Sequence, residues 1–240
     1  MRTDDNPLPL RDLHDSYDKA KGNLHVLETN VPIEKQMEYF RYSEKIKEVD
    51  TSSDEPVDEL IEILNSNEST VSKIKFALVC LASSGNVKAY RAIEAYNGIH
   101  SDDWSSMALL QAKITLQTQF SDEKQIFISS GLGGKEDLIR FYAFLKSTDR
   151  KYFSEYQRNL IEKEIPYYIE RYKGISEEID IKENYFTILF LVQFRVDVKK
   201  MMEDAVSECN QYGNFIDKRF IITNMKIFSD EEILRELLRK

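Results

Sequence analysis

Apolar residues recur at helical spacing through the first half of the chain. A helix that follows Pro32 has its apolar residues mostly on one face: Ile33, Met37, Phe40 and Ile46. The same spacing predicts four more helices, which begin near Pro56, Val71, Val87 and Asp102. Polar and small residues predict the ends of the first three near Asn65, Ser83 and Asn97-Gly98, and the fourth continues through Leu116. Ser69 or Thr70 and then Ser101 are the expected N-caps of the second and fourth.

These four helices repeat as two copies of one hairpin. The offsets are 32 residues for Ile61/Ile93 and Asn65/Asn97, 33 for Val71/Trp104 and 35 for Leu81/Leu116. A period in the thirties is typical of stacked helical hairpins. Residues 56–120 therefore resemble HEAT-like α-solenoid repeats, with Leu60–Leu64 in the first helix and Ala77 and Leu81 on the packing face of the second. An ordinary helical bundle is the alternative, because the Asp-Pro turn and following Arg of that family are absent.

After Asp122 the pattern changes to strand-like runs. Residues 125–130 (QIFISS) and 138–145 (LIRFYAFL) predict an antiparallel hairpin. A helix over 151–172 follows, which Pro166 should end or kink. Beyond it we expect a strand over 185–194, a helix from Asp197 to Cys209, a strand over 220–227 joined to the previous strand by a parallel crossover, and a helix opened by a Ser229–Glu232 capping box.

The expected fold class is a mostly helical α+β protein with an α-solenoid-like N-terminal part. We divide it into residues 1–55, a helical and linker segment with a short helix over Leu10–Lys21, residues 56–122, the HEAT-like hairpins, and residues 123–240, a ββαβαβα sandwich domain. The acidic stretch Glu48–Glu55 is the expected linker.

Charge is uneven along the 240 residues, whose formal net charge is −9. Residues 1–124 carry 14 Lys+Arg and 22 Asp+Glu, and residues 125–240 carry 19 and 20. Nucleic-acid affinity depends on cations that neutralise phosphates, so it is disfavoured for the first half and left open for the second. The N-terminus lacks the pattern of a signal peptide, no apolar run is long enough to span a bilayer, and Cys80 and Cys209 read as buried thiols, so we expect a cytoplasmic protein without a membrane partner.

The glycine-rich loop is the strongest candidate for ligand chemistry. Its residues, with one nearby cation, are Gly131, Gly133, Gly134, Lys135 and Arg140. Glycines let backbone N–H groups approach an anion, but a phosphate-binding P-loop would need Gly at Ser129 and a hydroxyl at Glu136. A plain hairpin turn is therefore the favoured interpretation.

No catalytic or metal-binding constellation is recognisable. His14, His25 and His100 are isolated, so neither a metal nor a cofactor is expected, and the sequence favours no enzymatic activity. The aromatic and basic residues of 152–173 resemble a nucleic-acid surface, but four glutamates interrupt them, and core packing is favoured.

The sequence thus predicts a non-catalytic adaptor with a protein partner or self-association, and nucleic acid is not the expected partner. The candidate partner-binding residues are Trp104, Ile233, Leu234, Leu237 and Leu238. The last four form the apolar stripe of a short C-terminal helix, which we expect to pack on its own domain. The alternatives are a ligand-binding domain, which could be an enzyme, centred on the glycine loop, and an RNA-binding module that uses the C-terminal sheet.

Overall fold

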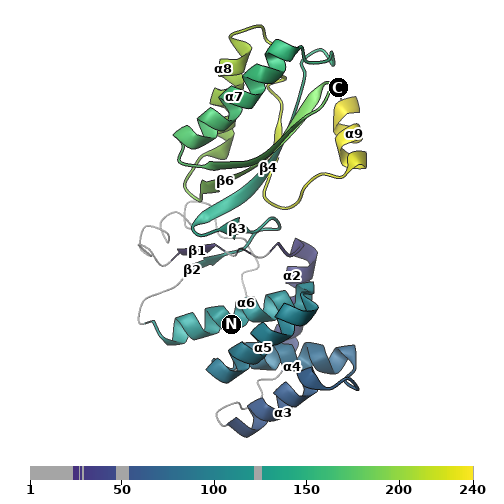
Figure 1. The fold of residues 1–240 in the computed structure, drawn as a ribbon, viewed down its shortest axis with the longest axis vertical. Helices are drawn as coiled ribbons and strands as arrows, with labels where there is room; N and C mark the ends of the chain where they lie inside the picture. Colours follow the sequence, from purple (N-terminus) through teal and green to yellow (C-terminus); the bar gives the residue numbers. More distant parts are fainter. Residues whose placement is uncertain (1–23, 27, 29, 47–53, 122–125, 240) are drawn as a thin grey trace, which may run out of the picture. The chain divides into compact units, whose positions relative to one another are not determined.

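The computed structural model describes residues 24–26, 28, 30–46, 54–121 and 126–239. The chain forms two compact units, Met1–Ile128 and Ser129–Lys240 (Figure 1). The predicted helix over Leu10–Lys21 and the linker up to residue 53 lie outside the described residues. The three-part division of the chain stays a prediction.

The first unit is built from helices α2 to α6. Their bounds are α2 Ile33–Lys45, α3 Asp54–Asn65, α4 Val71–Ser83, α5 Val87–His100 and α6 Asp103–Gln119. Thr70 caps α4 as expected. Two predicted boundaries were wrong: α5 continues through Gly98, and Asp102, in a capping box with Ser105, caps α6 in place of Ser101. Ser101 instead ends α5 in the left-handed conformation, at φ 44°.

The helices of the first unit bury one continuous apolar core. Tyr39 of α2 lies in it fully buried, with its hydroxyl 2.6 Å from Gln111. Leu78 and Leu81 of α4 and Ile93 of α5 are also fully buried. Helix α4 packs on α3, α5 and α6, as a helix in a stack of hairpins would. The HEAT-like nature of this segment stays a prediction.

The predicted hairpin of 125–130 with 138–145 was wrong. Strand β2, Ile126–Ile128, pairs in parallel with β1, Leu24–Val26. Strand β4, Leu138–Lys146, pairs instead with the two-residue strand β3, Gly134–Lys135, and with a strand later in the chain. A parallel partner about a hundred residues away leaves no local sequence signal, whereas a nearby glycine loop suggests a hairpin.

The second unit contains one curled antiparallel sheet. Its order is β3-β4-β6-β5, with β7 also on the edge of β4 that β3 occupies. The remaining strands are β5 Ile175–Ile181, β6 Tyr185–Gln193 and β7 Ile221–Thr223. The expected order lacked β5. Strands β6 and β7 run parallel to each other, but β4 lies between them, so they are not the neighbouring pair that the crossover implied.

Helices cover the two faces of this sheet unequally. Helices α7, Glu155–Arg171, and α8, Val198–Asn210, pack on the inner face, which we define by Ala143, Leu145, Phe186, Ile188 and Phe190. Helix α7 continues across Pro166, and Asp197 caps α8 as expected. Helix α9, Asp230–Leu238, lies on the outer face, which we define by Tyr142, Phe144, Tyr185, Leu189 and Ile221. The predicted mostly helical α+β class is confirmed.

Candidate functional site

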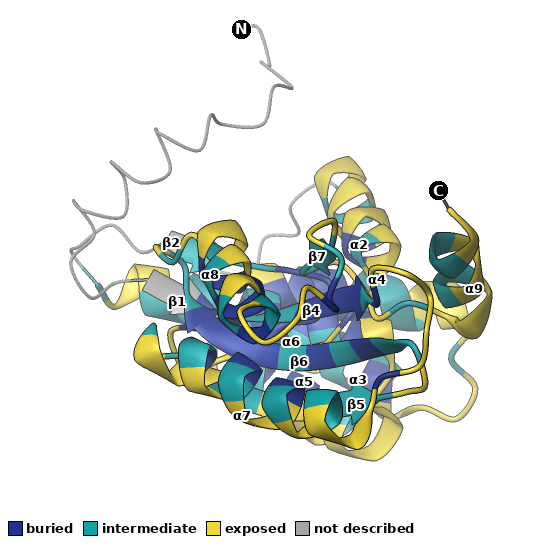
Figure 2. Cartoon of the chain, turned by 90° about the horizontal axis from the view of Figure 1, so that it is seen from above, coloured by how far each residue is buried: buried dark blue, intermediate teal, exposed yellow. Residues whose placement is uncertain are grey.

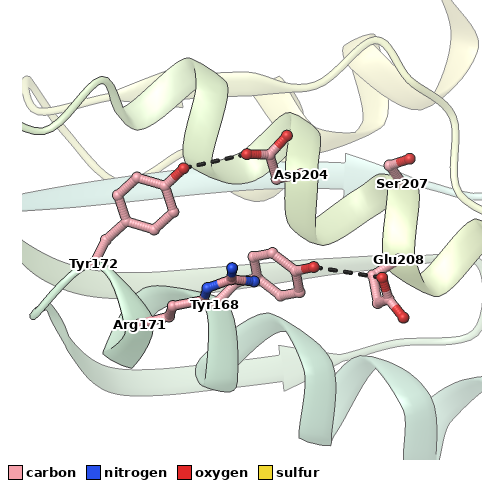
Figure 3. Close-up of a pocket in the computed structure, with 6 residues that line it drawn as sticks. All are labelled: Tyr168, Arg171, Tyr172, Asp204, Ser207 and Glu208. Atoms are coloured by element: carbon pink, nitrogen blue, oxygen red, sulfur yellow. Dashed lines mark hydrogen bonds between the residues drawn. The ribbon is translucent and has the colours of Figure 1, made fainter.

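Two surface hollows in the second unit gather polar side chains. The first lies between α7 and α8 and has a volume of about 320 Å³ (Figure 3). Tyr168 of α7 and Tyr172, the residue that follows this helix, project toward Glu208 and Asp204 of α8, as Figure 3 shows. The Tyr172 hydroxyl lies 3.1 Å from Asp204 Oδ2, and the Tyr168 hydroxyl 3.4 Å from Glu208 Oε2. Arg171 lies over the Tyr168 ring, 5.6 Å from its centroid.

The charges of this first hollow are satisfied from within. Lys200 donates to Asp204 at 2.7 Å, and this hydrogen bond holds the pKa of the Asp204 carboxyl below its ordinary value. Burial and then the negative charge of Glu208 raise the pKa of the Tyr168 hydroxyl, so it stays protonated at neutral pH. The hollow therefore joins two helices through tyrosine–carboxylate pairs, and Arg171 together with the adjacent Lys200 equals its two carboxylates in charge.

The second hollow lies at the C-terminal end of α9 and has a volume of about 360 Å³. It is formed by β4, by β7, by the two residues that precede β7, and by the end of α9. The residues that line it are Phe144, Lys146, Arg219, Phe220, Ile221, Glu236 and Arg239. Aromatic rings and cationic groups thus meet in one depression of the surface.

Near the C-terminal end of α9, Lys146 and Arg150 bind the last carbonyl groups of the helix. Lys146 Nζ lies 2.9 Å from the carbonyl oxygens of both Glu236 and Arg239. Arg150 Nη2 lies 3.4 Å from the carbonyl oxygen of Leu238. The last turn of a helix leaves its carbonyls without partners inside the helix and carries partial negative charge, so cations stabilise it.

Two more cations, Arg219 and Arg239, line the hollow with exposed side chains. Arg219 contacts Asp217 at 2.9 Å with a side chain 72% exposed, and Arg239 contacts Glu236 at 3.5 Å with a side chain 74% exposed. Their carboxylate partners are less accessible, with Asp217 12% and Glu236 20% exposed, and Arg219 binds both oxygens of Asp217. Four cations, Lys146, Arg150, Arg219 and Arg239, thus gather here, and two carboxylates partner them, Asp217 and Glu236.

The glycine loop predicted as a ligand site is a packed turn. Gly131 to Gly134 are buried, and a Cβ on Gly131 would lie 1.8 Å from the Met225 carbonyl oxygen. Leu132 N donates to Asn224 O at 3.1 Å, and Gly133, at φ 64°, accepts from Arg140 N at 3.1 Å. Lys135 is exposed on the short strand β3.

Arg140 is held within the unit. Its Nη2 lies 2.8 Å from Glu177 Oε1, its Nε donates to the other oxygen of that carboxylate, and its Nη1 lies 2.9 Å from Leu132 O. The structure thus brings Arg140 to the glycine loop, but its donors point at protein groups. That the loop binds a ligand stays a prediction.

The predicted partner-binding residues lie in two different settings. Trp104 sits in the core of the first unit, where Tyr39 and Tyr42 contact its ring and Lys75 Nζ lies 3.9 Å from the centroid. In α9, Ile233 and Leu237 pack on the outer face of the sheet, whereas Leu234 is 57% and Leu238 65% exposed. Neither setting identifies a partner.

Metal and membrane chemistry find no support in the described part of the chain. No group of three or more His, Cys, Asp or Glu among the described residues is placed to hold a metal ion. His100 stacks on Tyr96, with 4.2 Å between the ring centroids, and no histidine occurs in residues 129–240. Burial raises the pKa of Cys80 to about 11 and that of Cys209 to about 12, which keeps both thiols unreactive. Among the described helices, none has the length and apolar character to cross a bilayer.

Comparison with known proteins finds similarity only at the level of solved structures. No family model matches the chain, and no curated protein matches it in sequence. A proposed transposase from Deinococcus radiodurans R1 is similar at a TM-score of 0.34 and 9% identity, over 43% of this chain and 88% of that one. A REP-associated tyrosine transposase bound to a REP hairpin is similar at a TM-score of 0.33 and 8% identity, over 49% of this chain and 68% of that one.

These neighbours contradict the expected function. The sequence predicted a non-catalytic adaptor that binds protein and not nucleic acid, whereas both neighbours are transposases and one is bound to a REP hairpin. The prediction rested on the helical repeats, on the lack of a catalytic constellation and, against nucleic acid, on the net charge of residues 1–124. A charge sum over residues 125–240 does not show that four cations gather at one end of α9. The neighbours do not bear on the HEAT-like resemblance of residues 56–120.

Proposed function

We propose that the second unit binds nucleic acid at the hollow beside the end of α9. The observation that carries the proposal is the convergence of Lys146, Arg219 and Arg239 on a depression that Phe144 and Phe220 also line. Lysine and arginine neutralise backbone phosphates, and aromatic rings stack on bases. These are the two contacts that a nucleic-acid strand makes without regard to sequence.

The exposure of the two arginines favours this ligand. The side chains of Arg219 and Arg239 are 72% and 74% exposed, so each guanidinium has donors left to bind a phosphate while it keeps its carboxylate partner. A guanidinium can also contact two phosphate oxygens at once, which a lysine cannot. Residues 125–240 carry 19 basic and 20 acidic residues, so the positive field is local to the hollow and we expect a strong salt dependence at moderate affinity.

The groups that line the hollow are suited to binding. The unit has no histidine, and the described residues contain no group of three candidate ligands placed to hold a metal ion. Tyr168 and Tyr172, which contact carboxylates of α8, lie between α7 and α8 and do not line the cationic hollow. We therefore assign to the hollow a binding role alone.

A labelled single-stranded oligonucleotide titrated with the full chain tests the proposal. Fluorescence anisotropy from 50 to 200 mM salt should show binding that weakens as salt rises. Arg219→Gln with Arg239→Gln should weaken binding at low salt and lower the slope of log K against log salt by about 1.4, since two phosphate contacts are lost. The matched control, Arg171→Gln with Arg195→Gln, removes equal charge from exposed positions elsewhere in the unit and should keep the slope.

Two results would overturn the proposal. One is the absence of binding at 50 mM salt. The other is an equal loss of affinity in the Arg219/Arg239 pair and in the Arg171/Arg195 control, because net charge and not the hollow would then explain the binding.

A further inference from the structure

Beneath α9 the outer face of the sheet carries a connected group of aromatic rings. The ring centroids of Phe144 and Tyr185 lie 5.6 Å apart, those of Tyr142 and Phe228 5.4 Å, and those of Phe144 and Phe228 6.3 Å. Tyr142 and Phe144 are 3% and 2% exposed while α9 is in place. The largest aromatic area of this face is thus hidden by one short helix and by Phe228, which precedes it.

The cover that α9 provides is shallow. None of its residues is buried, and only Ile233 and Leu237 bring apolar side chains to the outer face. Figure 2 shows the contrast: β4 and β6 are largely dark blue, and α9 has only exposed and intermediate colours. A helix of nine residues has little stability of its own in water, so few contacts oppose its departure.

The hydroxyl of Tyr142 adds a cost to the covered state. It is buried and has no hydrogen-bond partner among the described residues. Burial raises the pKa of Tyr142 to about 12, and the nearby Thr187 reduces this rise. No hydrogen bond joins the two side chains. A buried hydroxyl without a partner destabilises the state that buries it, and exposure to water or to a ligand removes that cost.

The end of α9 occupies the cations that a phosphate would take. Lys146 binds the carbonyls of Glu236 and Arg239, and Arg150 binds the carbonyl of Leu238. Helix α9 and the residue after it also carry more acid than base, with Asp230, Glu231, Glu232 and Glu236 against Arg235 and Arg239. An acidic helix thus lies where its removal would free two cations and lower the local negative charge.

We propose that α9 is a displaceable cover and that single-stranded nucleic acid takes its place on the outer face. This inference rests on the proposed function and names its ligand class. Bases stack on Tyr142, Phe144 and Tyr185, and the backbone binds Lys146, Arg150 and Arg219, and also Arg239, which follows α9 and still reaches the phosphates when the helix has left the sheet. A single strand fits this face because its bases are free to stack on rings, whereas those of a duplex are already stacked inside the helix.

A loosened cover should raise affinity for a single strand. The open state is the one in which α9 has left the sheet. If only a small fraction of molecules is open, the apparent affinity falls by that fraction, and weaker packing of α9 raises both the fraction and the affinity. Ile233→Ala with Leu237→Ala removes the apolar contacts of α9, and we expect binding of a thymine oligonucleotide to tighten about tenfold. Leu234→Ala with Leu238→Ala is the matched control on the same helix, and its exposed side chains should leave affinity within about twofold of the unaltered chain.

An abasic strand of equal length separates stacking from charge. It keeps the phosphates and lacks the bases, so the loosened variant should gain much less for it than for the thymine strand. Circular dichroism and thermal melting establish that both double variants are folded. Equal gains for the two strands, or no gain for the thymine strand in a folded loosened variant, would overturn the inference.

Hydrogen exchange in the unaltered chain gives a second readout. The amide of Ile233 donates to Ser229 O at 2.9 Å and that of Arg239 to Arg235 O at 3.2 Å. Saturating single strand should speed exchange of these two amides, because the ligand displaces the helix that protects them. Slower or unchanged exchange would overturn the displacement, while salt-dependent binding that requires Arg219 would leave the proposed function intact.

Discussion

The two faces of the sheet in the second unit differ in how deeply the helices that cover them are buried. On the inner face, α7 and α8 contribute residues that are almost wholly buried, among them Ile161, Ile165 and Met202. On the outer face, α9 contributes no buried residue and lies over a smaller cluster. One sheet thus has a side that maintains the fold and a side whose cover is held by few contacts, and the cationic hollow borders the second side.

The difference between the two faces predicts that truncating an apolar side chain of α7 lowers the free energy of unfolding more than the same change in α9. Ile165→Ala should lower the free energy of unfolding by about 3 kcal/mol, because it leaves a cavity between α7 and the sheet. Leu237→Ala should cost about 1 kcal/mol, since that side chain is only partly buried. Urea denaturation of both variants measures the difference. Equal costs would mean that α9 is as integral to the unit as α7.

A smaller effect is expected at the pair of Arg140 and Glu177. The Arg140 hydrogen bond holds the pKa of Glu177 below its ordinary value of 4.5, and a carboxyl with a depressed pKa stabilises the fold above the unfolded pKa. Glu177→Gln should therefore cost about 1 kcal/mol at neutral pH, a figure kept low for a partly exposed pair. The difference from the unaltered chain should shrink as pH falls from 4.5 through the folded pKa. A pH-independent difference would assign the cost to packing.

Local signals in the sequence predicted several helix caps, although the end of α5 and the cap of α6 were wrong. The Ser229–Glu232 capping box and the Asp197 cap occur as expected, because each needs only residues within one turn. Strand β5 was missed, since the register shift between Ser176 and Glu178 breaks the alternation that would identify it. The apolar residues of β2 suggested a hairpin because nothing nearby reveals pairing with Leu24–Val26.

The candidate site could not be read from the sequence. Lys146, Arg219 and Arg239 lie at the end of a strand, before another strand and after the last helix, and only the fold brings them together. The glycine loop drew attention because its residues are consecutive, yet its fixed turn is built around Met225 and Asn224. A site made of consecutive residues is easily recognised in a sequence, whereas the residues of this hollow come from three separate segments of the chain.

Photocrosslinking tests the central claim most directly. A single-stranded oligonucleotide that contains 5-iodouracil, irradiated with the full chain, attaches to aromatic side chains in contact with its bases. The account predicts crosslinked peptides that contain Phe144, Tyr185 or Phe220, identified by mass spectrometry and lost when salt is raised. Crosslinks confined to the first unit, or to Tyr168 and Tyr172 between α7 and α8, would contradict it.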